Sequence, residues 1–91
     1  MTDRTKLMQL LAKRFPSCWF KEGELFSEEQ TGAIWSGSES KIDDLPMLNV
    51  YTSSNKKYYG GIHLKLYNFL KRHGWYNLYY DAGTTFFYPK N

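Results

Sequence analysis

The stretch GGIHLKLYNFLKRHGWYNLYYDAGTTFFYP, residues 60–89, decides the fold. Its first half has a helical period, because apolar side chains recur along one stripe: Ile62, Leu66, Phe69, Leu70 and His73. The glycine pair Gly60-Gly61 opens this segment, and Gly74 closes it, since glycine tolerates the left-handed conformation that ends many helices. We therefore predict a helix over residues 62–73.

A β-hairpin follows the helix without a linker. Asp81-Ala82-Gly83 is typical of a three-residue loop, so we expect Tyr80 to pair with Thr84. The register then fixes the two faces. One carries Leu78 opposite Phe86 and Tyr76 opposite Tyr88, and we expect it to be the core face. The other carries Asn77 opposite Phe87 and Tyr79 opposite Thr85, and we expect it to be covered by another element or to meet a partner.

The residues before this unit predict a helix and three strands. Thr2 or Asp3 can cap the helix, and Pro16 ends it, because proline pushes the residue before it out of the helical region. The strands are predicted over residues 18–26, 31–37 and 47–52, with a polar surface loop over residues 36–44. The order is α-β-β-β-α-β-β. We therefore predict an α+β fold in which two helices pack on a mainly antiparallel sheet, as a single domain over residues 1–91.

Composition favours a cytoplasmic protein. Cys18 is the only cysteine, so the chain has no disulfide framework. No apolar run approaches the roughly 20 residues that span a bilayer, and the N-terminal residues do not have the pattern of a signal peptide. We expect no membrane partner.

Charge is distributed unevenly along the chain. Residues 1–21 carry a net +4, residues 22–44 a net −6 and residues 45–91 a net +5. This pattern indicates two basic ends that lie close in space, beside an acidic flank. The alternative is that these charges only keep the surface solvated.

The sequence offers no catalytic, metal-ligating or cofactor-binding set. The two histidines, His63 and His73, lie ten residues apart on the predicted helix and so on different turns. Cys18 has no second thiol beside it, and its neighbours favour a small buried hydrophobic residue over a nucleophile. We predict that the chain is not an enzyme.

Nucleic-acid binding is the alternative function. Lys56, Lys57, Lys71 and Arg72 are interleaved with aromatic residues, and this combination suits phosphates and stacked bases. The first five predicted elements also follow the order of double-stranded-RNA-binding domains.

Two resemblances accompany these patterns. Residues 66–91 resemble the helix–GW–strand–turn–strand unit of the HicA mRNA interferase family, but Thr84 or Thr85 stands where that family has its histidine after the turn glycine. This resemblance implies a similar unit and puts interferase activity in question. The segments GAIWSGSES, IDDLPMLN and HGWYNLYYDAGTTFFYP are similar to small proteins encoded by phages and prophages of enteric bacteria. That resemblance implies an accessory role in a bacterial cytoplasm.

The leading hypothesis is a small non-enzymatic binding module, derived from a phage, that acts on a host or phage macromolecule, most simply a protein. Its predicted surface combines one face of the hairpin with the basic side of the second helix: Asn77, Tyr79, Thr85, Phe87, Lys65, Lys71 and Arg72. The reason is an aromatic content beyond what so small a core needs. Self-association through an open sheet edge is a further expectation.

Overall fold

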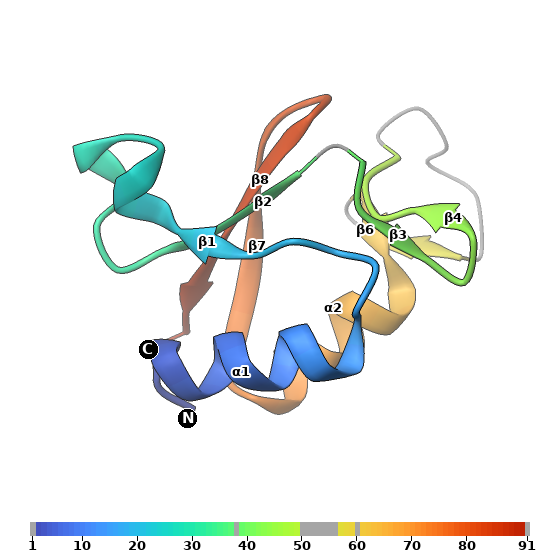
Figure 1. Cartoon of the computed structure of the whole chain (residues 1–91), viewed down its shortest axis with the longest axis horizontal. Coiled ribbons are helices and arrows are strands. Elements are labelled where there is room, and N and C mark those ends of the chain that lie inside the picture. The colour runs from blue at the N-terminus through green and yellow to red at the C-terminus, as the bar shows by residue number, and fades with distance from the viewer. Residues whose placement is uncertain (1, 38, 50–56, 60, 91) are drawn as a thin grey trace.

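The computed structural model describes residues 2–37, 39–49, 57–59 and 61–90. Within these ranges, two helices lie against a four-stranded antiparallel sheet with two short hairpins beside it (Figure 1), which confirms the predicted α+β class. The elements in chain order are α1 (Arg4–Arg14), β1 (Lys21–Glu22), η1 (Gly23–Leu25), η2 (Glu28–Gln30), β2 (Ile34–Gly37), β3 (Lys41–Ile42), β4 (Leu45–Pro46), β5 (Tyr58–Tyr59), β6 (Ile62–His63), α2 (Leu64–Arg72), β7 (Trp75–Asp81) and β8 (Thr84–Pro89).

Helix α1 forms as its sequence predicts. The Asp3 carboxylate caps it by accepting the backbone N–H of Lys6 at 2.9 Å. The helix ends at Arg14, just before Phe15 and Pro16. Leu7 and Leu11 point into the core and are fully buried.

Helix α2 begins later than predicted. Gly61 has a positive φ of 85° and turns the chain between β5 and β6, so Ile62 and His63 pair as a strand with Tyr58 and Tyr59. His63 is the actual N-cap, and its Nδ1 accepts the N–H of Lys65 at 3.1 Å. The predicted stop is confirmed, because the helix ends at Arg72 and Gly74 has a φ of 78°.

The main sheet has the order β1-β2-β8-β7. Most of the predicted hairpin register is confirmed, including the pairs Tyr76–Tyr88, Leu78–Phe86 and Tyr79–Thr85. The tip differs. Asp81 pairs with Thr84, and a bulge between Tyr79 and Asp81 takes up the extra residue, so Tyr80 has no partner opposite it.

The strand predicted over residues 18–26 is shortened to β1. Gly23 approaches the backbone of η2 so closely that a Cβ there would lie 2.4 Å from the carbonyl oxygen of Gln30. The chain turns at this contact into the short helix η1. The loop predicted over residues 36–44 also contains a strand, β3, because Ile42 is buried and pairs with Leu45. Of the strand predicted over residues 47–52, Leu48 forms a single bridge to Ile62, and residues 50–52 lie outside the described residues.

The prediction of which hairpin face is the core face is wrong. The sheet face that carries Ile34, Trp75, Thr85 and Phe87, called here the inner face, packs against both helices in one apolar cluster with Leu11 and Leu66. Phe87 and Thr85 are fully buried. The opposite side, the outer face, carries Trp35, Tyr76, Leu78, Tyr80, Phe86 and Tyr88.

Candidate partner-binding surface

Strand β7 presents a row of large exposed side chains on the outer face. Tyr76 is 45% exposed, Leu78 52% and Tyr80 52%. Alternation along the strand brings Tyr76 and Leu78 to the same side, and the bulge leaves Tyr80 there as well. Neither helix covers this side. The described residues thus leave a row of large, partly apolar side chains on the outer face open to water.

The outer face is held rigid by packed rings. Phe86 is buried beneath Phe26 and Tyr80, with ring centroids 5.1 Å and 5.5 Å away. Phe26 also contacts Trp35 edge-on at 5.2 Å. Tyr76 stacks on Tyr88 at 6.1 Å. These edge-on and stacked pairs stabilise one arrangement of the rings, so a partner would meet a preformed surface.

Lys21 contacts two tryptophan rings at the β1 side of the outer face. Its Nζ lies 5.3 Å from the ring centroid of Trp19 and 5.5 Å from that of Trp35. The indole Nε1 of Trp35 is, among the described residues, the buried side-chain polar atom that has no hydrogen-bond partner. A buried donor without an acceptor costs free energy.

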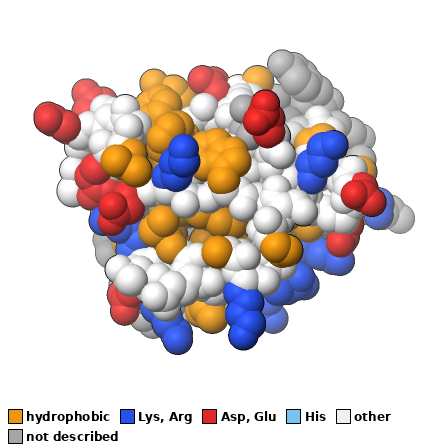
Figure 2. All heavy atoms as spheres, viewed as in Figure 1, with side chains coloured by type: hydrophobic (Ala, Val, Ile, Leu, Met, Phe, Trp, Pro, Cys, Tyr) orange, Lys and Arg blue, Asp and Glu red, His pale blue; other side chains and the backbone are white. Residues whose placement is uncertain are grey.

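Acidic residues lie in two segments next to the outer face. Glu28 and Glu29 belong to η2, and the Tyr88 hydroxyl fixes that turn by donating to the Gln30 side chain. Asp81 follows Tyr80 at the hairpin tip. In Figure 2 exposed hydrophobic side chains in the upper part of the view lie beside acidic ones, with a Lys or Arg side chain among them, and further Lys and Arg side chains lie along the lower edge, where Figure 1 places α1.

The Glu24 carboxylate links η1 to α1. Glu24 accepts the backbone N–H of Gly32 at 3.1 Å and the Arg4 guanidinium at 2.6 Å. The Gly32 N–H, followed by Arg4, lowers the pKa of the Glu24 carboxyl to about 2. Arg4 also pairs with Glu22 at 3.0 Å.

The structure divides the residues predicted to bind a partner. Thr85 and Phe87 belong to the buried inner face, which corrects their assignment. Lys65 forms an ion pair with Asp43, and Arg72 lies over the ring of Phe69 at 5.6 Å. Tyr79 is 49% exposed.

Asn77 and Lys71 do come together, in a pocket of about 110 Å³ between α2 and β7. This edge pocket is lined by Tyr67, Leu70, Lys71, Trp75, Tyr76, Asn77 and Lys90.

The predicted nucleic-acid set is only partly placed. Lys56 lies outside the described residues, and Lys57 is exposed at the start of β5. Lys71 and Arg72 lie in the last turn of α2. Of these cations, Lys71 lines the edge pocket together with Tyr76 of the outer face.

Other chemistry is sparse. In the described ranges no group of three or more His, Cys, Asp or Glu side chains is placed to hold a metal ion. Cys18 is half-buried, its Sγ donates to the carbonyl of Lys41 at 3.3 Å, and burial raises the pKa of its thiol. His63 is almost fully buried, and this burial lowers the pKa of its imidazole. Neither described helix is long and apolar enough to cross a membrane.

Sequence reasoning missed Tyr76, Leu78, Tyr80 and Lys90. The available signal was the pair Phe86-Phe87, because adjacent aromatic residues in a strand show that both faces meet apolar neighbours.

Comparison of the chain with protein-family models, curated proteins and solved structures found no match.

Proposed function

We propose that this chain is a small non-enzymatic binding module that holds a partner protein on the outer face of its sheet. The observation that carries the proposal is the row of half-exposed side chains on β7, namely Tyr76, Leu78 and Tyr80. Side chains of this kind, fixed by aromatic neighbours and lacking a cover, are typical of the centre of protein–protein interfaces.

Charge supports a protein partner over a nucleic acid at this face. Glu28 and Glu29 belong to the turn that Tyr88 contacts through Gln30, and Asp81 directly follows Tyr80. Lys21 lies over two indole rings. A stacked single strand would need cations here to follow its phosphates. An apolar protein surface needs none.

The test uses two variants and one purified partner. Wild-type protein, the double variant Leu78→Ser/Tyr80→Ser and the control Leu25→Ser are used to capture proteins from a nuclease-treated bacterial lysate. Leu25 suits the control because it is 69% exposed and lies beside α1, in a groove with Met8 and Phe20. The captured protein is then purified, and its affinity is measured by calorimetry, with circular dichroism as the check on folding.

We expect the outer-face variant to lose at least about tenfold in affinity, which corresponds to roughly 1.4 kcal/mol, and the control to bind like the wild type. Equal binding by a folded outer-face variant would overturn the proposal. Capture that disappears after nuclease treatment would instead assign the partner to the nucleic acids.

A further inference from the structure

The outer edge of β7 has unpaired backbone groups. The strand is the last in the order β1-β2-β8-β7, so β8 pairs with only one of its edges. The N–H of Lys90 donates to the carbonyl of Gly74 at 2.7 Å, which identifies Gly74 and Lys90 as a hydrogen-bonded pair. Such pairs occur at every second position of an antiparallel ladder. The backbone groups of Tyr76 and Leu78 therefore face β8, and those of Asn77 and Tyr79 face outward.

A side-chain contact supports this assignment. The hydroxyl of Thr85 donates to the carbonyl of Leu78 at 3.1 Å, as expected if that carbonyl points toward β8. Among the described residues, no turn, loop or helix cap forms a backbone hydrogen bond with Asn77 or Tyr79. Two residues thus offer two donors and two acceptors along an open edge.

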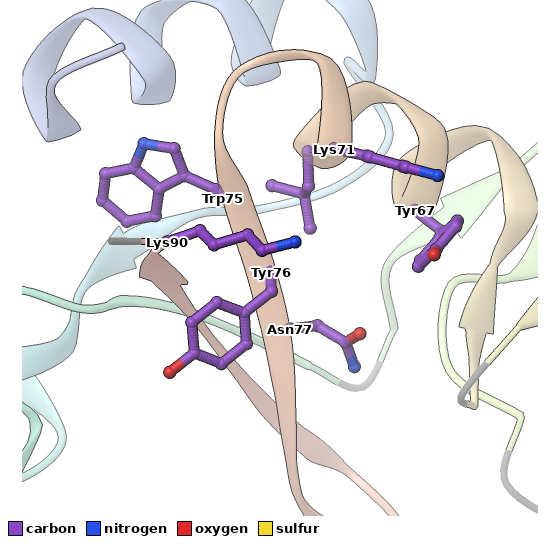
Figure 3. Close-up of a pocket in the computed structure, with 7 residues that line it drawn as sticks. Tyr67, Lys71, Trp75, Tyr76, Asn77 and Lys90 are labelled. Atoms are coloured by element: carbon purple, nitrogen blue, oxygen red, sulfur yellow. The ribbon is translucent and has the colours of Figure 1, made fainter. Parts of the chain in front are cut away.

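The edge pocket lies beside these groups. Figure 3 shows Asn77 and Tyr76 on β7, with Lys71 and Tyr67 on α2 to one side and Lys90 reaching across the strand. Asn77 belongs both to the pocket and to the open edge. A chain that pairs with Asn77 would therefore place a side chain at the pocket.

The pocket has a positive character. Lys71 and Lys90 are both exposed, and none of its seven lining residues is acidic. The described ion pairs use Arg4 and Lys65, so they leave these two ammonium groups without a carboxylate partner. The Asn77 amide adds a neutral donor. Two such cations beside an amide favour a carboxylate.

We propose that β7 accepts an extended, acidic segment of the partner protein as an additional strand. The segment pairs through its backbone with Asn77 and Tyr79 and places a carboxylate between Lys71 and Lys90. Its alternate side chains extend the row of Tyr76, Leu78 and Tyr80 on the outer face. This mode is strand addition at a sheet edge, in which backbone bonds supply affinity and pockets supply specificity. The inference rests on the proposed function only in taking the partner to be a protein.

The experiment separates the backbone from the side chain at one position. Tyr79→Pro removes the outward N–H and leaves the bonds to β8 intact, since proline is tolerated where an edge N–H faces solvent. Tyr79→Ala is the matched control, because it removes the ring and keeps the N–H. Lys71→Gln/Lys90→Gln tests the charge without touching the strand. The probe is a display library of random linear peptides selected on the wild-type protein, and affinities are measured by fluorescence polarisation.

We expect the selected peptides to be enriched in Asp and Glu. Their affinity should fall by at least about tenfold in Tyr79→Pro, change little in Tyr79→Ala and lose its dependence on acidic residues in the lysine variant. Neutral or basic peptides, or equal binding to the proline and alanine variants, would overturn the inference. If Tyr79→Pro does not fold, the lysine variant decides alone, because unchanged preference for acidic peptides would refute the pocket.

Other occupants have their own outcomes. Sedimentation that shows a dimer in the wild type and a monomer in Tyr79→Pro would assign the edge to a second copy of this chain. Oligonucleotide binding lost in the lysine variant and kept in Tyr79→Pro would assign the pocket to a phosphate. Each result overturns the acidic strand. If Leu78→Ser/Tyr80→Ser loses the captured partner and Tyr79→Pro keeps it, the proposed function stands and only the edge inference fails.

Discussion

The two faces of the β7–β8 hairpin are both aromatic, but one is buried in the core and the other is partly exposed. On the inner face Phe87 is fully buried against the helices. On the outer face Leu78 and Tyr80 remain half-exposed although Phe86, the neighbour of Phe87 in sequence, is buried there too. The difference lies in what covers each face. Two helices seal the inner one, whereas the turn that carries Phe26 reaches over only part of the outer one. Apolar character alone therefore does not identify a core.

The strongest test of this contrast removes one large side chain from each face. Phe87→Ala should lower the free energy of unfolding by about 3–5 kcal/mol, because it leaves a cavity among helices that cannot collapse into it. Leu78→Ala should cost less than about 1 kcal/mol, because the side chain is half in water already. Urea unfolding of both variants measures the difference. Similar losses would mean that the outer face is sealed as tightly as the inner one.

A second test concerns the close contact between β2 and the tip of the β7–β8 hairpin. Gly37 pairs with Thr84 near the hairpin tip, and a Cβ at this position would lie 2.2 Å from the carbonyl oxygen of Gly83. Gly37→Ala must move backbone, so we expect a loss of about 1–3 kcal/mol in the free energy of unfolding. Thermal unfolding would reveal it as a lower melting temperature. A variant as stable as the wild type would show that the tip has room to shift.

A third test concerns the helix that covers the inner face. His63→Ala should cost about 1 kcal/mol, because the N–H of Lys65 loses its acceptor, and His63→Asn should restore most of this by offering an amide oxygen. Burial lowers the pKa of His63 below its usual value near 6.5, although nearby Asp43 opposes the effect and Lys65 and Lys57 reinforce it. Stability from neutral His63 is therefore complete above that pH and is lost as the pH falls through it.

Urea unfolding of the wild type and His63→Asn between neutral and mildly acidic pH checks the sign. The wild type should lose stability across this range, and the asparagine variant should lose less. A wild type that gains stability on acidification would contradict the assignment of His63 as a neutral cap.

The smallest expected effect concerns the ion pair that links Arg4 of α1 to Glu24 of η1. The pKa of Glu24 is about 2, below its usual value of 4.5, so the ionised carboxylate stabilises the fold above that usual value. This contribution is lost as the pH falls from about 4.5 toward 2. Glu24→Gln should lower the stability slightly at neutral pH and flatten the acid limb of the stability profile by the same small amount, since the pair is exposed to water. A variant with the wild-type acid limb would show that the pair contributes nothing measurable.

Much of the fold follows from local chemistry. Asp3 and Pro16 bound α1, Gly74 ends α2, and the alternation on either side of the hairpin tip fixes most of its register. These features depend on a few neighbouring residues, so the sequence predicts them. Helix α2 begins later than predicted because Ile62 and His63 pair as a strand with β5, and this pairing leaves no trace in the helical periodicity.

The candidate site was harder to predict, because it depends on contacts between distant segments. Periodicity shows that Phe86 and Phe87 point to opposite faces and does not say which face the helices cover. The edge pocket joins Lys71 of α2 to Lys90, which follows β8, and nothing in their separation of 19 positions marks them as neighbours. Asn77 was predicted as a site residue because it shares a face with Phe87, and Phe87 is in fact buried, whereas Lys71 was predicted from the basic side of the second helix.

The corner at Gly74 gathers both ends of the described chain. The N–H of Thr2 donates to the carbonyl of His73 at 3.0 Å, the indole of Trp75 donates to Thr2, and Lys90 bonds to Gly74 itself. Both ends thus lie at the start of β7, and the hairpin tip points the other way (Figure 1). A tether attached at either end would hold the edge pocket toward its support and leave Tyr80 free. Immobilised protein would then report on one half of the interface and mask the other, so affinities are best measured with both molecules in solution.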